Sequence, residues 1–268
     1  MLIAKPFFRY LRPAIRATYH SLYRTMLPLH WWLVDRLSHD RASRGFPLPP
    51  AKLRFRVGES SGGTEFLQVG ERTFTNIESS LADAGYRMDA FKNVLDLGCG
   101  CGRTLIWLVD ILPAIHWHGT DVDAEAIEWC RENIPKARFT VNAPLPPLPY
   151  PDSAFDFVYA ISVFTHLDEK YQRAWIPELA RVIKRDGLLL VTFHSEHVWK
   201  RLSLSEEIER EGIVVSVSAK LRGVVPDWYQ TTFQTPIHLL NSLSTHFTIV
   251  RHVSRGFGDQ DAVIALRE

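Results

Sequence analysis

Seven consecutive residues, Asp96 to Gly102, have the composition of a ligand-binding turn. They read DLGCGCG, so that glycine alternates with other residues. Glycine accepts positive φ angles and lets the backbone approach a ligand closely. An apolar run precedes this loop and an amphipathic run follows it. The loop is therefore expected to connect a buried strand to a helix, at whose N-terminus unpaired N–H groups collect.

The residues around the loop favour a cofactor that carries an amino acid over a dinucleotide. A dinucleotide-binding turn has glycines spaced G-x-G-x-x-G, and the position of the third glycine is taken by Arg103. Asp96 stands at the end of the strand. A carboxylate there would repel a pyrophosphate, but it can hold an ammonium group.

A second acidic position lies about twenty residues further along the chain. The next apolar run ends at Thr120 and Asp121. A carboxylate at that strand tip can accept from both hydroxyls of a ribose. Asp123 is better suited to capping the following helix, so Asp121 is the candidate ribose ligand.

These residues need a scaffold, and the sequence around them alternates between short apolar runs and amphipathic stretches. We expect strands at 94–97, 116–120, 138–141, 155–160 and 188–194, and helices at 64–84, 102–111, 124–133 and 168–183. This alternation is typical of a parallel sheet covered on both faces. Two further runs, 247–253 and 262–266, leave no room for a helix between them and predict an antiparallel pair at one sheet edge.

Four segments in this order resemble the class I S-adenosylmethionine-dependent methyltransferases. They are VLDLGCGCGRT, GTDVD, VNAPLPPLPYPDSAFDFVYAISVFTHL and RVIKRDGLLLVTF. The resemblance covers roughly residues 53–266 and is densest over residues 94–193. It implies an α/β fold, a Rossmann-like doubly wound sheet of seven strands whose last strand is antiparallel. It also implies an enzyme with S-adenosyl-L-methionine as its cofactor.

The resemblance assigns roles to individual positions. Asp96 would hold the cofactor's amino group, and the loop residues Gly98, Cys99 and Gly100 would line its binding site. Asp121 would take the ribose hydroxyls. The remaining cofactor-binding candidates are Asn142 and Ala143 beside the adenine, and Ala160 and Ile161 beside the methionine portion and the acceptor. Asn142 departs from the family's usual aspartate, although its side-chain oxygen can still accept from an amine.

Two histidines are candidates for a general base. Methyl transfer requires mainly that the nucleophile is aligned, but an oxygen nucleophile can also need a base, most often histidine. Ligands of open α/β sheets bind beyond the C-terminal ends of the strands, where His166 and His194 are expected. Either of them can instead be a structural loop residue. A later stretch can line an acceptor pocket or cover the sheet through Tyr229, Thr231 and Phe233.

Composition argues against two other classes of protein. The chain has 268 residues and a formal net charge of +1, which does not favour a nucleic-acid partner. Its three cysteines are Cys99, Cys101 and Cys130. This odd number argues against a disulfide scaffold and favours the cytoplasm.

No metal site is expected. Two loop cysteines and two strand histidines would be the candidate ligands: Cys99, Cys101, His116 and His118. Zinc sites usually contain a C-x2–4-C knuckle, and this spacing is absent from the four residues. They are interpreted as loop and strand residues.

We divide the chain into an N-terminal helical extension with a linker, residues 1–50, and a methyltransferase domain, residues 51–268. The extension is basic and aromatic, with Lys5, Arg9, Arg12 and Arg16 beside Phe8, Leu11, Ile15 and Tyr19, followed by Trp31 and Trp32. Pro13 is expected to interrupt any helix and to stand in the first turn of a second one. Residues 1–32 can pack on the domain, cap the acceptor cleft, or make weak peripheral contact with an anionic membrane.

The sequence thus predicts methyl transfer to a small-molecule, sugar or lipid-linked acceptor, with oxygen as the favoured nucleophile. One alternative is a protein or nucleic-acid methyltransferase, although the residues after the fourth strand, AISVFTHL, lack the Asn/Asp-Pro-Pro-aromatic motif of many nucleic-acid enzymes. The other is a non-catalytic module that binds S-adenosylmethionine. The oligomeric state is left open.

Overall fold

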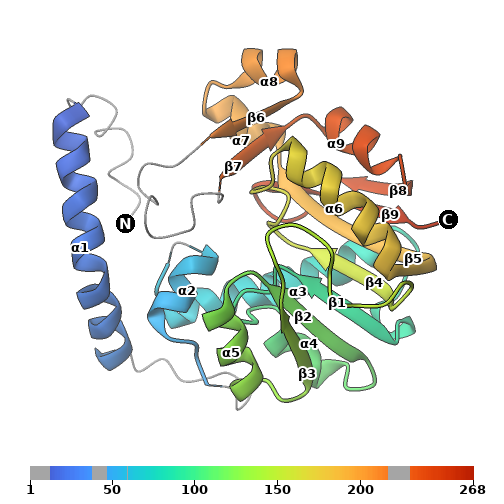
Figure 1. The fold of residues 1–268 in the computed structure, drawn as a ribbon, viewed down its shortest axis with the longest axis horizontal. Coiled ribbons are helices and arrows are strands. Elements are labelled where there is room, and N and C mark those ends of the chain that lie inside the picture. Colours follow the sequence, from blue (N-terminus) through green and yellow to red (C-terminus); the bar gives the residue numbers. More distant parts are fainter. Residues whose placement is uncertain (1–12, 38–46, 59, 217–229) are drawn as a thin grey trace.

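The computed structural model describes residues 13–37, 47–58, 60–216 and 230–268. Its centre is a seven-stranded sheet in the order β3-β2-β1-β4-β5-β9-β8 (Figure 1). The strands are β1 (Asn93–Leu97), β2 (His116–Asp121), β3 (Ala137–Val141), β4 (Phe155–Ala160), β5 (Ile183–His194), β8 (Thr248–Val253) and β9 (Gln260–Leu266). Neighbours among β1 to β5 pair in parallel, and β9 is antiparallel to both β5 and β8. The predicted Rossmann-like sheet with an antiparallel last strand is confirmed.

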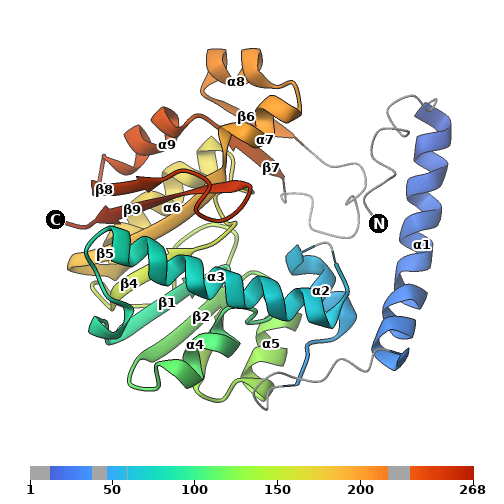
Figure 2. The same cartoon turned by 180° about the vertical axis from the view of Figure 1, so that it is seen from behind.

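Two layers of helices enclose the sheet. On one face lie α3 (Gly63–Asp83), α4 (Leu105–Ile111) and α5 (Ala124–Asn133), whose apolar side chains share one core cluster. Figure 2 shows α3 crossing this face. On the other face, α6 (Glu169–Val182) and α9 (Pro236–Leu243) build a second cluster. The central strands β1, β4 and β5 are therefore buried on both sides, as their continuous apolar runs require.

Local signals fix the ends of several helices. Gly85, with φ +85°, follows the end of α3 and accepts the left-handed conformation that stops a helix. The Asp123 carboxylate caps α5 by accepting from the backbone N–H groups of Glu125 and Ala126, as expected. The Asp168 carboxylate caps α6 in the same way.

The helix after the glycine loop starts later than predicted. It begins at Leu105 rather than at Gly102, because Gly102 has φ +73° and cannot be part of a right-handed helix. The extra residues make the turn from β1 into α4.

Several elements were not predicted. They are the short helix α2 (Ala51–Gly58), the 3-10 turn η3 (Met88–Ala90), the helices α7 (Glu196–Arg201) and α8 (Ser205–Glu211), the helix α9, and the strands β6 (Ile213–Ser216) and β7 (Thr231–Gln234). Strands β6 and β7 form an antiparallel hairpin that lies with α7 and α8 beyond the C-terminal end of β5 (Figure 1). Phe233 of this hairpin is buried with Val198, Trp199 and Ile208.

Helix α1 (Pro13–Leu37) lies at the periphery and packs against α2 (Figures 1 and 2). Its described residues begin at Pro13, so the predicted interruption of the helix at this proline stays a prediction. Its contacts with the domain come from Tyr23, Leu27 and Trp31, which surround Phe55 of α2. The predicted basic residues Lys5, Arg9 and Arg12 lie outside the described residues. Among the described helices, none is long and apolar enough to cross a membrane.

Candidate functional site

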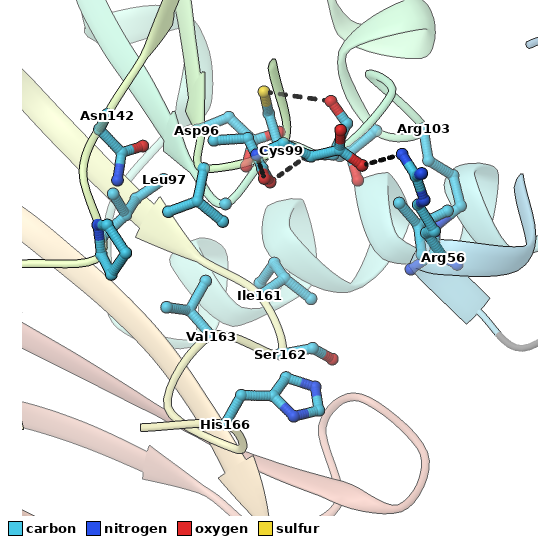
Figure 3. Close-up of a pocket in the computed structure, with 18 of the residues that line it drawn as sticks. Arg56, Asp96, Leu97, Cys99, Arg103, Asn142, Ile161, Ser162, Val163 and His166 are labelled. Carbon is cyan, nitrogen blue, oxygen red and sulfur yellow. Dashed lines mark hydrogen bonds and ion pairs between the residues drawn. The ribbon is translucent and has the colours of Figure 1, made fainter. Parts of the chain in front are cut away.

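A cavity of about 780 Å³ opens beyond the C-terminal ends of β1, β2 and β4. This is the edge where open α/β sheets bind their ligands, and the volume suits one cofactor with part of a second molecule. Its walls come from the loop after β1, the loop after β2, the segments that follow β3 and β4, and α2 (Figure 3). The topology therefore brings together residues that are distant in sequence.

The glycine loop forms a cradle that no larger residue could occupy. Gly98 and Gly100 have φ angles of +76° and +53°. A Cβ atom on Gly98 would stand 2.4 Å from Cγ2 of Val163, and one on Gly100 would stand 2.4 Å from Cγ1 of Val57. Both glycines thus accept a left-handed backbone and let Val163 and Val57 pack directly against the loop. Cys99, between them, also lines the cavity, and burial raises the pKa of its thiol well above the ordinary value, so it stays neutral.

Asp121 stands at the tip of β2 and holds the loop in place. One carboxylate oxygen accepts from the backbone N–H of Gly100 at 2.8 Å, and the other accepts from the N–H of Asp123 at 2.8 Å. Burial raises the pKa of Asp121, and these N–H groups oppose that rise because they stabilise the ionised form. Each carboxylate oxygen has more than one lone pair, so the group can accept further bonds from a ligand in the cavity.

Asp96 lies deeper, at the end of β1. Only 4% of it is exposed, and it lines the cavity. Burial raises the pKa of this carboxyl to about 8, and the Asp121 carboxylate adds to that rise, while Tyr159 and Arg103 oppose it. A buried carboxyl of this kind becomes ionised when a cation binds beside it.

The segment after β3 provides the wall next to β2. The side-chain oxygen of Asn142 accepts from the Thr120 hydroxyl at 2.8 Å, and its amide nitrogen donates to the carbonyl of Ala143 at 2.7 Å. Asn142 is therefore held rigidly and lines the cavity. Ala143 is exposed and is not among the lining residues. Trp175 closes this side, and its indole N–H donates to the carbonyl of Pro144 at 3.0 Å.

The loop after β4 forms the opposite wall. Ile161 lines the cavity, whereas the preceding residue, Ala160, is fully buried behind it. Ser162 has φ +61°, an unfavourable value for a residue with a side chain. Three bonds hold it in place. Its N–H donates to the Thr192 hydroxyl at 2.8 Å, that hydroxyl donates to the Gln260 side chain at 2.6 Å, and the Gln260 amide donates back to the Ser162 oxygen at 2.6 Å.

The two histidine candidates have different surroundings. His166 lines the cavity, and its Nδ1 lies 2.6 Å from the carbonyl oxygen of Gln230 (Figure 3). A carbonyl can only accept, so Nδ1 carries the proton and Nε2 is the basic nitrogen.

His194 does not line the cavity. Its ring stacks on Phe233 at 5.0 Å between centroids. Burial, with a contribution from His166, lowers the pKa of His194 to about 4, so it is neutral at physiological pH. In the hairpin, Thr231 does not line the cavity either, Phe233 packs into the cluster around Trp199, and Tyr229 falls outside the described residues.

Sequence reasoning missed the contribution of α2. Arg56 and Val57 line the cavity. The Arg56 guanidinium donates to Asp123 at 2.8 Å and to Glu125 at 2.9 Å, and Lys52 pairs with Glu125 at 2.7 Å. The basic pair on one face of α2 is visible in the sequence, but its acidic partners lie about seventy positions away. Ser162, Val163 and Leu167, which also line the cavity, were missed too, because small and apolar side chains carry no chemical signal.

Comparison with known proteins identifies the same region. Residues 94–187 match the model of a methyltransferase domain. The chain is 25% identical to a fatty-acid O-methyltransferase of Mycolicibacterium smegmatis over 175 residues, which are 65% of this chain and 54% of that protein. It is 28% identical to phthiotriol/phenolphthiotriol dimycocerosates methyltransferase 1 of Mycobacterium ulcerans over 146 residues, 54% of this chain and 49% of that protein. The chain therefore spans about half the length of these curated relatives.

A solved structure with the same fold is magnesium protoporphyrin IX methyltransferase from Synechocystis PCC 6803, determined with bound S-adenosylhomocysteine. Its TM-score with this chain is 0.55 at 19% sequence identity, and the match covers 80% of this chain and 93% of that one. This likeness supports the fold of the chain.

Proposed function

Because this chain belongs to the class I S-adenosylmethionine-dependent methyltransferases, we propose that it methylates an oxygen atom of a small-molecule, sugar or lipid-linked acceptor. The observation that supports this most directly is the cavity at the strand ends. It combines a glycine cradle with the carboxyl groups of Asp96 and Asp121 on one side and a histidine with a fixed tautomer on the other.

The residues present fit the cofactor. When bound, S-adenosylmethionine supplies a methyl group on a positively charged sulfur atom. Asp96 is assigned to the ammonium group, because its buried carboxyl is stabilised by a neighbouring cation. Asp121 is assigned to the ribose hydroxyls, and Asn142 to the adenine wall. The cradle of Gly98 and Gly100 allows close approach of the backbone.

Cys99 and Ile161 complete the cofactor side of the cavity in this proposal. Ala143 could contribute only its backbone N–H, because its side chain is not among the lining groups. Ala160 would act through the position of Ile161, since it is fully buried behind the wall.

The acceptor side suits an apolar molecule with one polar group. Its lining includes Ile161, Val163 and Leu167, with the polar residue Ser162 among them. Relatives of this chain include methyltransferases named for a fatty acid and for phthiotriol-type lipids. Apolar walls with a few polar groups are typical of sites that orient a small ligand. A lipid-linked or similarly apolar acceptor is therefore favoured over a protein or a nucleic acid.

His166 is proposed as the general base. Its Nδ1–H donates to the Gln230 carbonyl, so Nε2 can accept the hydroxyl proton of the acceptor as the oxygen–methyl bond forms and the sulfur–methyl bond breaks. His194, which lies outside the cavity and is neutral, is proposed to support the hairpin instead.

The test compares the wild type with His166→Gln and His194→Gln, using a long-chain fatty alcohol and a long-chain fatty acid as acceptors. His166→Gln should lower kcat with the alcohol by about 100-fold or more, within the usual range for a general base. The same variant should lower kcat with the fatty acid much less, because the carboxylate of that acceptor is already ionised. Its affinity for S-adenosylhomocysteine should stay within twofold. Equal losses in both histidine variants, or no turnover of any oxygen acceptor by the wild type, would contradict the proposal.

A further inference from the structure

Helix α1 presents an apolar stripe that no described part of the chain covers. Its members recur at intervals of three and four residues, and they are Leu22, Met26, Leu29, Leu33 and Leu37. This spacing places them on one side of the helix. The exposed fraction is 61% at Leu22 and 65% at Leu37. At a rise of 1.5 Å per residue, the stripe is about 22 Å long.

A different face of the same helix attaches it to the domain. Tyr23, Leu27 and Trp31 pack around Phe55 of α2, and Leu27 is 4% exposed. The Asp35 carboxylate accepts from the N–H of Ala51 and pairs with Arg54. Among the described residues, packing thus uses one side of α1 and leaves the leucine stripe largely exposed. A contiguous exposed apolar surface of this kind usually marks an interaction site.

Charge indicates which partner fits. Residues 1–37 contain six basic residues and one acidic residue, whereas residues 38–268 contain 25 basic and 29 acidic residues. The single acid, Asp35, is neutralised by its partners on α2. Arg36 lies over the Trp32 ring at 5.4 Å, and Trp32 is 55% exposed beside the stripe. A basic segment with an apolar stripe and an adjacent tryptophan complements an anionic lipid surface.

We propose that α1 docks the protein on an anionic lipid bilayer, lying in the plane of the headgroups with the leucine stripe buried. It lies on the membrane and does not cross it, because the helix is not apolar enough to span one. This inference goes beyond the proposed reaction and does not depend on it. None of residues 13–37 lines the cavity, so docking and catalysis use separate parts of the described chain.

A second copy of this chain is the competing occupant of the stripe. Two such helices in a symmetric pair would bring two strongly basic segments together, and like charges at close range oppose association. An anionic bilayer is instead attracted by the same charges. The charge distribution therefore favours lipid over self-association.

The test measures binding of the full chain to phosphatidylglycerol–phosphatidylcholine vesicles and to pure phosphatidylcholine vesicles by flotation. The partition coefficient should be at least tenfold higher for the anionic vesicles and should fall when salt is raised. In the variant Leu29→Ser/Leu33→Ser, the partition coefficient for anionic vesicles should fall at least tenfold. In the matched control Ser21→Ala/Thr25→Ala, on exposed positions beside the stripe, it should stay within twofold of the wild type.

Circular dichroism and thermal unfolding check that every variant is folded, which is expected because the changed residues are exposed. Sedimentation without vesicles measures the oligomeric state. A dimer that dissociates in Leu29→Ser/Leu33→Ser would overturn the proposal in favour of a second copy. Equal binding to both vesicle types, or equal losses in stripe and control variants, would overturn it as well. Loss of turnover in His166→Gln with intact vesicle binding would leave this inference standing.

Discussion

Raising the pH from 6 to 8 should strengthen the binding of S-adenosylhomocysteine through Asp96. The ligand has the same ammonium group as the methyl donor, and the Asp96 carboxyl, with a pKa of about 8, is protonated below that pH. Binding beside the ammonium group requires the carboxylate, so the proton must leave. Affinity should therefore rise with pH while Asp96 is increasingly ionised.

The magnitude follows from the pKa. With a pKa of about 8, roughly 1% of Asp96 is ionised at pH 6, roughly 9% at pH 7 and half at pH 8. The ligand's α-amino group belongs to a free amino acid, whose carboxylate makes it more basic than a peptide N-terminus, so it stays mostly charged over this range. The ionised fraction of Asp96 therefore rises about ninefold from pH 6 to 7 and about 50-fold from pH 6 to 8. At pH 7 about 0.9 proton should be released per ligand bound.

Isothermal titration in buffers of different ionisation enthalpy measures both the affinity and the number of protons released. The control ligand is 5′-methylthioadenosine, which has the nucleoside but no amino acid, and its affinity should be flat over the same range. The control variant Asp96→Asn should bind S-adenosylhomocysteine weakly and without the slope. A flat profile for S-adenosylhomocysteine with the wild type would refute the assignment of Asp96 to the ammonium group.

The Asp96 carboxyl should destabilise the ligand-free protein when it is ionised. Its folded pKa lies above the ordinary value of 3.8, so the folded state prefers the protonated form. The stability of the wild type should therefore decrease as the pH rises from about 4 to 8. Asp96→Asn should unfold at a higher temperature than the wild type at pH 8, with a smaller difference at pH 4. A variant that is less stable than the wild type at pH 8 would contradict the stated burial.

Three further predictions concern the cofactor site. Asp121→Ala should weaken S-adenosylhomocysteine binding at least tenfold, because hydrogen bonds to a charged acceptor contribute about 1.5–3 kcal/mol each. The Gly100 N–H also loses its partner in this variant. Unchanged affinity in titration would refute the assignment of Asp121 to the ribose hydroxyls. Gly98→Ala should abolish binding and lower the melting temperature, and adding Val163→Ala should recover only part of the stability, because the φ of +76° remains. Nicotinamide dinucleotides should not bind at micromolar concentration, because Arg103 replaces the third glycine.

The sheet could be predicted from sequence because its signals are local. Buried parallel strands such as β1 and β4 are short apolar runs, and glycine, aspartate and proline mark the ends of their neighbouring helices. β4 and α5 have the predicted bounds. The start of α4 was wrong for a physical reason, since the ligand loop continues through Gly102 in a left-handed conformation that a periodicity argument does not detect.

The site could be predicted only where its chemistry lies in one short segment. Asp96, Gly98 and Asp121 lie at or directly after strand ends, so fold and role are inferred together, and all three line the cavity. The contact of Arg56 with Asp123 depends on tertiary packing between residues 67 positions apart and has no local signature. The same holds for the network of Ser162, Thr192 and Gln260, whose members are ordinary polar residues until β4, β5 and β9 bring them together.

The separation of the two histidines also required the structure. His166 follows the C-terminal end of β4 and His194 is the last residue of β5, so the sequence places both near strand ends and treats them alike. The hairpin of β6 and β7 covers His194 with Phe233 and leaves His166 at the cavity wall. That hairpin was not predicted, because two four-residue strands carry too little periodicity to be distinguished from a loop.

Transfer of a labelled methyl group is the most direct test of the central claim. The purified chain is incubated with methyl-labelled S-adenosylmethionine and a cell extract that contains its small molecules, lipids, proteins and nucleic acids, with Asp121→Ala as the control. The label is expected in a small or lipid-linked compound as an oxygen-bound methyl group, and the Asp121→Ala control should transfer far less of it. Label found in protein or nucleic acid, or no transfer by a chain that binds S-adenosylhomocysteine, would contradict it.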